Sequence, residues 1–195
     1  MKVFRIILCF FIIFSLVSCD KNEFNNLYSF IDSYNDISRE TIDISDFFFD
    51  SASPVKYTAV IGEDGNEIAL EIDCDNSGNI YLIKISVIKN KNIRPDYTQI
   101  RNFGNVLRNT LLAYCQFNEN ECEDILNLLG LNNTDTINKE GELTLKRENY
   151  YFVYYSTQLL SQLMIYNTYL HQIEPTEKPV SKPYYAEDFI IKETP

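Results

Sequence analysis

The sequence predicts an α+β fold, in which an antiparallel β-sheet of two three-stranded meanders carries a helical hairpin on one face. Residues 68–73 and 142–146 alternate apolar and polar or small side chains, which is the period of strands with one buried face, and residues 150–156 are rich in aromatic residues that favour strands. Between them, residues 94–115 and 118–129 repeat apolar side chains at helical spacing. This order of strands, two helices and strands is typical of an α+β domain.

The first meander is expected over residues 55–89. Its strands are predicted at residues 57–61, 68–73 and 81–88. The second of these alternates apolar residues with polar or small ones, which predicts one buried face and one wetter face. Residues 62–66 and 76–79 contain glycines that tolerate positive φ, so each segment is expected to be a turn.

The predicted hairpin consists of two helices joined by a short loop. Pro95 favours a helix start, and the first helix is expected to end near Cys115. Asn118 and Glu121 have the spacing of a capping box for the second helix, and Gly130 suits the position after its end. The apolar face of the first helix comprises Ile100, Phe103, Leu107, Leu111 and Tyr114.

The second meander is expected to begin with strands at residues 142–146 and 150–156. Residues 159–169 fit two interpretations, because their apolar side chains recur at helical spacing but also alternate as in a strand. We favour a third strand, since Thr157 and Gln158 provide a tight connection within a meander.

Residues 1–18 have the parts of a secretory signal peptide. Lys2 and Arg5 give a positive start. Residues 6–16 form an apolar run that is shorter than the ~20 residues of a membrane-spanning helix. The run ends in Leu16-Val17-Ser18-Cys19. This tetrapeptide resembles the lipobox of bacterial lipoproteins, in which a Leu-type residue, two small or modest residues and Cys follow one another.

The resemblance implies that residues 1–18 are removed and that Cys19 becomes an acylated N-terminus, carrying palmitate or similar chains. Two or more chains hold a protein stably on a membrane, because each buried CH₂ contributes about 0.8 kcal/mol. We therefore expect a lipid-anchored, extracytoplasmic protein of the cell membrane or envelope. The alternatives are an ordinary secreted protein whose signal contains a cysteine, and an uncleaved anchor helix.

The mature chain is expected to have three parts. Residues 19–54 form an acidic tether, residues 55–170 form the α+β domain, and residues 171–195 form a Pro-rich tail. The tether is expected to be partly packed, because its apolar residues recur at helical spacing over residues 24–34. Residues 47–49 are three phenylalanines that either pack on the domain, which we favour, or form an exposed partner-binding patch. The tail is expected to be extended and held against the domain by Tyr184, Tyr185 and Phe189.

The chain is acidic, with 28 Asp and Glu against 17 Lys and Arg and a formal net charge of −11. Removal of residues 1–18 takes away Lys2 and Arg5 and no acid, so the mature charge becomes −13. Such a chain is repelled by nucleic acid and by anionic headgroups, and nucleic acid is therefore excluded as a partner. Solubility is the simplest role of this charge, and a basic partner or a cation is the alternative.

Three cysteines remain beyond the lipobox, namely Cys74, Cys115 and Cys122. An odd number in an extracytoplasmic compartment predicts one disulfide and one free thiol. Cys115 ends the first predicted helix and Cys122 lies in the first turn of the second, so a hairpin can bring this pair within disulfide range. We expect the Cys115–Cys122 bridge, and free buried thiols are the alternative. The chain has no Cys-x-x-Cys metal motif.

One loop resembles the first part of a calcium-binding loop. Asp73, Asp75 and Ser77 place oxygen atoms at its first, third and fifth positions, and Gly78 follows at the sixth. Lys84 stands at the twelfth position, where such loops carry a bidentate Glu, and strands are expected on both sides. A plain hairpin turn is therefore the favoured interpretation, and a calcium site is the alternative.

The sequence shows no catalytic constellation. His171 is the only histidine, and no Ser, Cys or Asp stands at motif spacing to partner it. We therefore expect a non-enzymatic binding or interaction module without a cofactor, whose partner is a protein or another envelope component. The alternative is an inhibitor or immunity-type lipoprotein that captures another protein through an acidic surface. The tyrosines of residues 150–155 are expected either to form an aromatic binding surface or to be covered on both sides.

Overall fold

The computed structural model describes residues 26–52, 55–62, 67–89, 97–132, 137 and 140–170. These residues form one seven-stranded antiparallel sheet with helices, which confirms the predicted α+β class. The strands are β1 (Phe48–Ala52), β2 (Val55–Ile61), β3 (Ile68–Cys74), β4 (Ile80–Ile88), β5 (Gly141–Arg147), β6 (Tyr150–Ser156) and β7 (Leu160–Asn167). The helices are α2 (Leu27–Ile37), the short 3₁₀ helix η1 (Ile44–Asp46), α3 (Tyr97–Cys115) and α4 (Glu119–Leu128). The predicted signal peptide, Cys19 and the tail at residues 171–195 lie outside the described residues.

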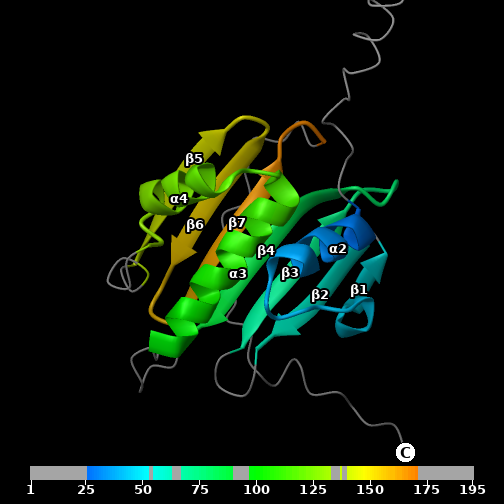
Figure 1. The fold of residues 1–195 in the computed structure, drawn as a ribbon, viewed down its shortest axis with the longest axis horizontal. Coiled ribbons are helices and arrows are strands. Elements are labelled where there is room, and N and C mark those ends of the chain that lie inside the picture. Colours follow the sequence, from blue (N-terminus) through cyan, green and yellow to red (C-terminus); the bar gives the residue numbers. More distant parts are fainter. Residues whose placement is uncertain are drawn as a thin grey trace, which may run out of the picture.

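The strand order is β1-β2-β3-β4-β7-β6-β5, and all neighbouring strands are antiparallel. β1 to β4 form one meander and β5 to β7 form another, and the two join where β4 pairs with β7 (Figure 1). The first meander thus has four strands, whereas three were expected. The added strand β1 has a register shift between Phe49 and Ser51, which interrupts the alternation from which strands are predicted. The ambiguous residues 159–169 contain strand β7, so the favoured interpretation is confirmed.

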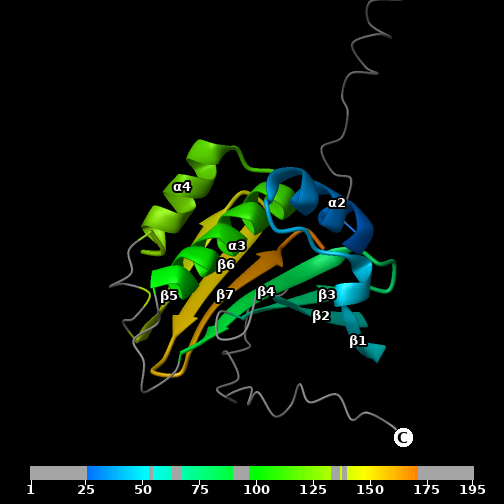
Figure 2. The ribbon, with the colours of Figure 1, turned by 60° about the horizontal axis from the view of Figure 1, so that its bottom comes forward.

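The three α-helices of the described residues lie on one face of the sheet (Figures 1 and 2). α2 lies over the β2–β3 side, α3 over the centre and α4 over the β5–β6 side (Figure 1). In the central strands, every second side chain points toward the helices and joins one core, as Ile68, Leu70 and Ile72 of β3 do. From the helices the core receives Phe30, Tyr34, Phe103, Leu107, Leu111 and Ile125. Within the part of the chain that is described, no helix is both long and apolar enough to cross a membrane.

The packed domain includes Asn26 and α2, which lie inside the segment that was expected to be a partly packed tether. The Asn26 side-chain oxygen accepts a 3.0 Å hydrogen bond from the Ser29 N–H and so caps α2. The backbone of Asn26 also forms a β-bridge with Asn79, at the turn between β3 and β4. α2 packs along α3 and buries its apolar face, which consists of Leu27, Phe30, Ile31 and Tyr34. Residues 20–25 are the six residues between Cys19 and Asn26 in the sequence.

Candidate functional site

The predicted calcium loop is a turn whose carboxylate binds its own backbone. One Asp75 oxygen accepts hydrogen bonds from the backbone N–H groups of Ser77 at 2.8 Å and Asn79 at 2.9 Å. The other oxygen accepts from the Asn79 side chain at 3.1 Å. Burial raises the pKa of Asp75, but the hydrogen bonds from Asn79 and the turn amides outweigh it and hold the pKa below its ordinary value.

A second predicted ligand, Asp73, belongs to strand β3 of the sheet. Its carboxylate lies 3.9 Å from the ammonium group of Lys84, on the neighbouring strand β4. Within the described residues, no three or more His, Cys, Asp or Glu side chains gather as they would around a metal ion. Calcium binding through Asp73, Asp75 and Ser77 stays a prediction, and the oxygens of Asp75 already have donors in the turn.

The three described cysteines, Cys74, Cys115 and Cys122, are buried and carry free thiols. Burial raises the pKa of Cys122 to about 11 and that of Cys74 to about 12, and it also raises the pKa of Cys115. Protonated, buried thiols are poor nucleophiles, so none of the three is suited to catalysis. The Cys115–Cys122 bridge is not formed in this structure and stays a prediction.

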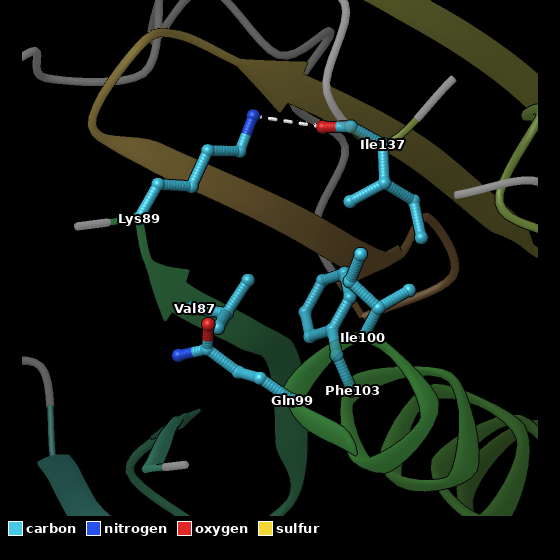
Figure 3. A pocket seen from close by; sticks show the side chains of 6 residues that line it. All are labelled: Val87, Lys89, Gln99, Ile100, Phe103 and Ile137. Atoms are coloured by element: carbon cyan, nitrogen blue, oxygen red, sulfur yellow. Dashed lines mark hydrogen bonds between the residues drawn. The ribbon is translucent and has the colours of Figure 1, made fainter. Parts of the chain in front are cut away.

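A buried lysine at the end of β4 organises a polar cluster that the sequence analysis missed. Lys89 is 6 % exposed. Its ammonium group donates hydrogen bonds to the carbonyl oxygen of Ile137 at 2.7 Å, to the Ser156 hydroxyl at 2.7 Å and to the Thr157 carbonyl oxygen at 3.0 Å. Burial lowers the pKa of Lys89 to about 8, although the Glu140 carboxylate acts in the opposite direction. Figure 3 shows Lys89 reaching Ile137 beside a small recess, which is lined by Val87, Lys89, Gln99, Ile100, Phe103 and Ile137.

Several donors of this cluster converge on one atom, the carbonyl oxygen of Ile137. Besides Lys89, it is reached by the hydroxyl groups of Tyr154 at 3.2 Å, Ser156 at 3.1 Å and Ser161 at 3.1 Å. A serine beside an amine resembles a nucleophile and its base, but Ser156 and Ser161 are only 2 % and 0 % exposed. The cluster therefore fixes residue 137 to the β6–β7 hairpin and has the geometry of a structural clamp.

The exposed apolar surface lies elsewhere, on the edge strand β1. Phe47 is buried, whereas Phe48 and Phe49 are each 59 % exposed. The packing prediction for residues 47–49 thus holds for Phe47, and the exposed-patch alternative describes the other two. Phe48 pairs with Thr58 and Phe49 with Tyr57, so their side chains point to opposite faces of the sheet. β1 has a strand neighbour on one side only within the described sheet, which leaves its outer backbone groups available (Figure 1).

Acidic side chains flank these two phenylalanines. Asp43 and Asp46 border η1 directly before β1, and Asp50 follows Phe49 at the register shift. All three aspartates are exposed. We call Phe48, Phe49 and these three aspartates the β1 edge. Its combination of aromatic rings, carboxylates and unused backbone groups suits recognition of another chain.

The opposite edge strand, β5, lacks this character. β5 carries Glu142, Lys146 and Arg147, all exposed, and its largest exposed apolar side chain is Leu143 at 44 %. Mixed charges along an edge are a common protection against pairing with other strands. The two edges of one sheet therefore differ, and the β1 edge is the better candidate for a docking site.

The sheet face opposite the helices, which we call the open face, carries an apolar group and a charged group side by side. The apolar group, here the Met164 cluster, consists of Leu82, Val153 and Met164 with Tyr81, Tyr151 and Tyr166 packed against them. The charged group has Lys84 3.7 Å from Glu71 and Lys56 3.8 Å from the same carboxylate. Tyr150 and Tyr154 point the other way and pack in or against the main core, so β6 has apolar packing on both faces.

Comparison of the chain with protein-family models, with curated proteins and with solved structures finds no significant match.

Proposed function

We propose that this chain is a lipid-anchored, non-enzymatic interaction module of the cell envelope, which binds another protein along the β1 edge. The observation that carries the proposal is the pair of exposed phenylalanines, Phe48 and Phe49, on a strand that has no strand neighbour on its outer side among the described residues. An extended segment of a partner can add to such an edge through main-chain hydrogen bonds. The phenylalanines then supply apolar contacts above and below the sheet.

The charge of the β1 edge defines the partner's chemistry. Asp43 and Asp46 precede the two phenylalanines in the sequence and Asp50 follows them, and no Lys or Arg lies between residues 43 and 52. A partner strand with apolar side chains and flanking Lys or Arg residues is complementary in charge and shape. The same aspartates favour the second candidate function, an inhibitor or immunity-type lipoprotein that captures a basic protein.

The position of Asn26 supports a role close to the membrane surface. Seven residues lead from Cys19 to Asn26. Even a fully extended chain of that length spans only about 25 Å. A lipid on Cys19 therefore holds α2 and the β3–β4 turn near the bilayer, because Asn26 bridges Asn79. The proposed partner would therefore bind the domain close to the membrane surface.

A photo-activatable side chain placed at position 48 of the membrane-bound protein tests the proposed docking edge. Position 143 on β5 is the matched control, since Leu143 is also an exposed apolar residue of an edge strand. We expect irradiation of living cells to give a discrete protein adduct from position 48 and none from position 143. Phe49→Ser in the same chain should weaken that adduct about tenfold, as loss of an aromatic hot spot does.

A second variant tests the charge of the edge. Replacing Asp43, Asp46 and Asp50 by Asn keeps the side-chain shape and removes three negative charges, and it should weaken the same adduct. Circular dichroism of each variant establishes that the fold is retained. Equal adducts from positions 48 and 143, no adduct from position 48, or an adduct that neither change weakens would each refute the proposal.

A further inference from the structure

We propose, on the basis of the function proposed above, that the partner docks on the β1 edge as a short extended segment. One residue of this segment exchanges main-chain hydrogen bonds with Phe49 and places an apolar side chain beside the Phe49 ring. Two properties of Phe49 support this form of docking, namely its place in the strand register and the direction of its backbone groups.

Phe49 is the outermost member of a row of apolar side chains that crosses all seven strands, and each member is the register partner of the next. From β5 to β1 the row comprises Leu145, Phe152, Ile165, Ile83, Ile72, Tyr57 and Phe49. Phe152, Ile165, Ile83 and Ile72 are each 0 % exposed, whereas Phe49 is 59 % exposed. Its ring centroid lies 5.8 Å from that of Tyr57. An apolar side chain opposite Phe49 on an added strand would become the next member of the row.

The direction of the backbone groups along this row follows from a hydrogen bond at the end of β4. In an antiparallel sheet, one residue directs both its N–H and its C=O to one neighbouring strand, and the next residue directs them to the other. The Lys89 N–H donates a 2.7 Å hydrogen bond to the Leu159 carbonyl oxygen, so the backbone of Lys89 faces β7. Ile83 lies an even number of residues before Lys89, and the register with β7 has no shift between them. The backbone groups of Ile83 therefore face β7 as well.

The register carries this alternation outward to β1. Because Ile83 faces β7, its other register partner, Ile72, faces β2, where it meets Tyr57. Tyr57 therefore faces β3, and its pair with Phe49 is one without main-chain bonds. The backbone groups of Phe49 thus point away from the sheet, on the side where β1 has no strand neighbour among the described residues, whereas those of Phe48 point inward to β2 (Figure 1). A partner residue can bond to Phe49 without displacing a bond of the sheet.

The local structure of β1 limits the paired segment to about three residues. Asp50 is the extra residue of the register shift, and such a bulge interrupts pairing after Phe49. Before it, the Phe47 N–H already donates a 3.2 Å hydrogen bond to the Ile44 carbonyl oxygen. A second copy of this chain is a poor occupant, because the aspartates of the two β1 edges would repel one another. A segment that flanks its apolar residue with Lys or Arg is complementary.

Hydrogen exchange of the purified full chain, followed by NMR, tests the outward direction of the Phe49 backbone. We expect the Phe49 N–H to exchange at least about tenfold faster than the Phe48 N–H, which faces β2. Equal protection of the two groups would overturn the proposal, and this measurement needs no substitution.

Two substitutions of Phe49 separate the main-chain contact from the side chain. Proline and valine are both apolar and similar in size, but proline lacks the N–H group. Both variants should keep the fold, because proline is tolerated on an edge strand where the N–H faces solvent. The experiment uses the membrane-bound full chain with the photo-activatable side chain at position 48. We expect Phe49→Pro to give at least about tenfold less adduct than Phe49→Val.

The matched control makes the same two changes at Thr144, an exposed residue of the edge strand β5 whose backbone groups point outward by the same alternation, and should leave the adduct unchanged. Equal adducts from Phe49→Pro and Phe49→Val would overturn the main-chain pairing and leave the docking edge itself standing. No adduct from the parent chain would refute the docking edge and the pairing together. An adduct with a second copy of this chain would overturn the proposed partner, and loss of the fold in Phe49→Pro alone would overturn the outward direction of the Phe49 N–H.

Discussion

Replacement of Phe30 by alanine is expected to destabilise the domain by about 3–5 kcal/mol, as large-to-small changes in a packed core do. Phe30 lies in α2, is 0 % exposed and packs with its ring centroid 5.8 Å from that of Tyr34. The change removes a buried ring between α2 and the sheet. Urea unfolding, followed by circular dichroism, measures the free energy of unfolding.

Tyr28→Ala is the matched control, because Tyr28 lies on the same helix and is 67 % exposed. Its effect should stay within about 0.5 kcal/mol, as for most surface substitutions. If both variants are as stable as the parent, α2 is part of a loose tether and does not belong to the domain. The comparison therefore also tests whether α2 belongs to the folded unit.

Replacement of Lys89 by methionine should destabilise the domain by about 2 kcal/mol at pH 7, because a buried acceptor left without its donor costs 1–3 kcal/mol. Methionine keeps the length of the side chain and removes its three donors. The Ile137 carbonyl oxygen retains the hydroxyl groups of Tyr154, Ser156 and Ser161, but the Thr157 carbonyl oxygen loses the donor on Lys89. The loss should be smaller than for Phe30→Ala, since the buried charge is removed as well.

The pH dependence of the same variant gives a sharper result. Burial lowers the pKa of Lys89 in the folded protein to about 8, from an ordinary value of 10.5. Between these values the unfolded chain holds a proton that the folded chain has released. Lys89 alone therefore makes stability rise with pH in this window, by up to about 1.4 kcal/mol per pH unit. Below pH 8 both states hold the proton, and above pH 10.5 neither does.

Buried thiols act in the opposite direction. The pKa values of Cys74 and Cys122 are raised from 9.0 to about 12 and about 11, so the unfolded chain loses these protons first and stability falls as pH rises above 9. Lys89→Met removes the opposing contribution, and its stability should fall more steeply than that of the parent between pH 8 and 10. The exposed Lys146→Met is the control and should follow the parent curve. Parallel curves for Lys89→Met and the parent would contradict the assigned pKa.

The elements that the sequence predicted well are those with unbroken periodicity. β6 is an unbroken run of aromatic and β-branched residues from Tyr150 to Tyr155, and the helical spacing from Ile100 to Tyr114 has no break, so both elements were found. β1 was missed because its register shift at Asp50 breaks the alternation after only two residues. The order of the strands was also out of reach, since β4 pairs with β7 across more than seventy residues of sequence.

The candidate sites were harder to predict for the same reason. The cluster around Lys89 joins groups that are 48, 67 and 68 residues apart in the chain, and its only local signal is a lysine at the end of an apolar strand. Phe48 and Phe49 look like core residues by composition. They are exposed because β1 is an edge strand. The position of β1 at the edge is set by the strand order of the sheet, which the residues of β1 do not reveal. Asp75 was found as an oxygen-bearing side chain, but only the fold shows that the turn itself uses its oxygens.

The claim that this domain works at a membrane surface depends on acylation of Cys19. Metabolic labelling with a fatty acid that carries a clickable group measures it directly, on the full chain in its own cells. We expect the wild-type protein to carry the label and to sediment with membranes, and Cys19→Ala to lose both properties. An unlabelled wild-type protein, or a Cys19→Ala variant that keeps the label, would contradict the lipid anchor.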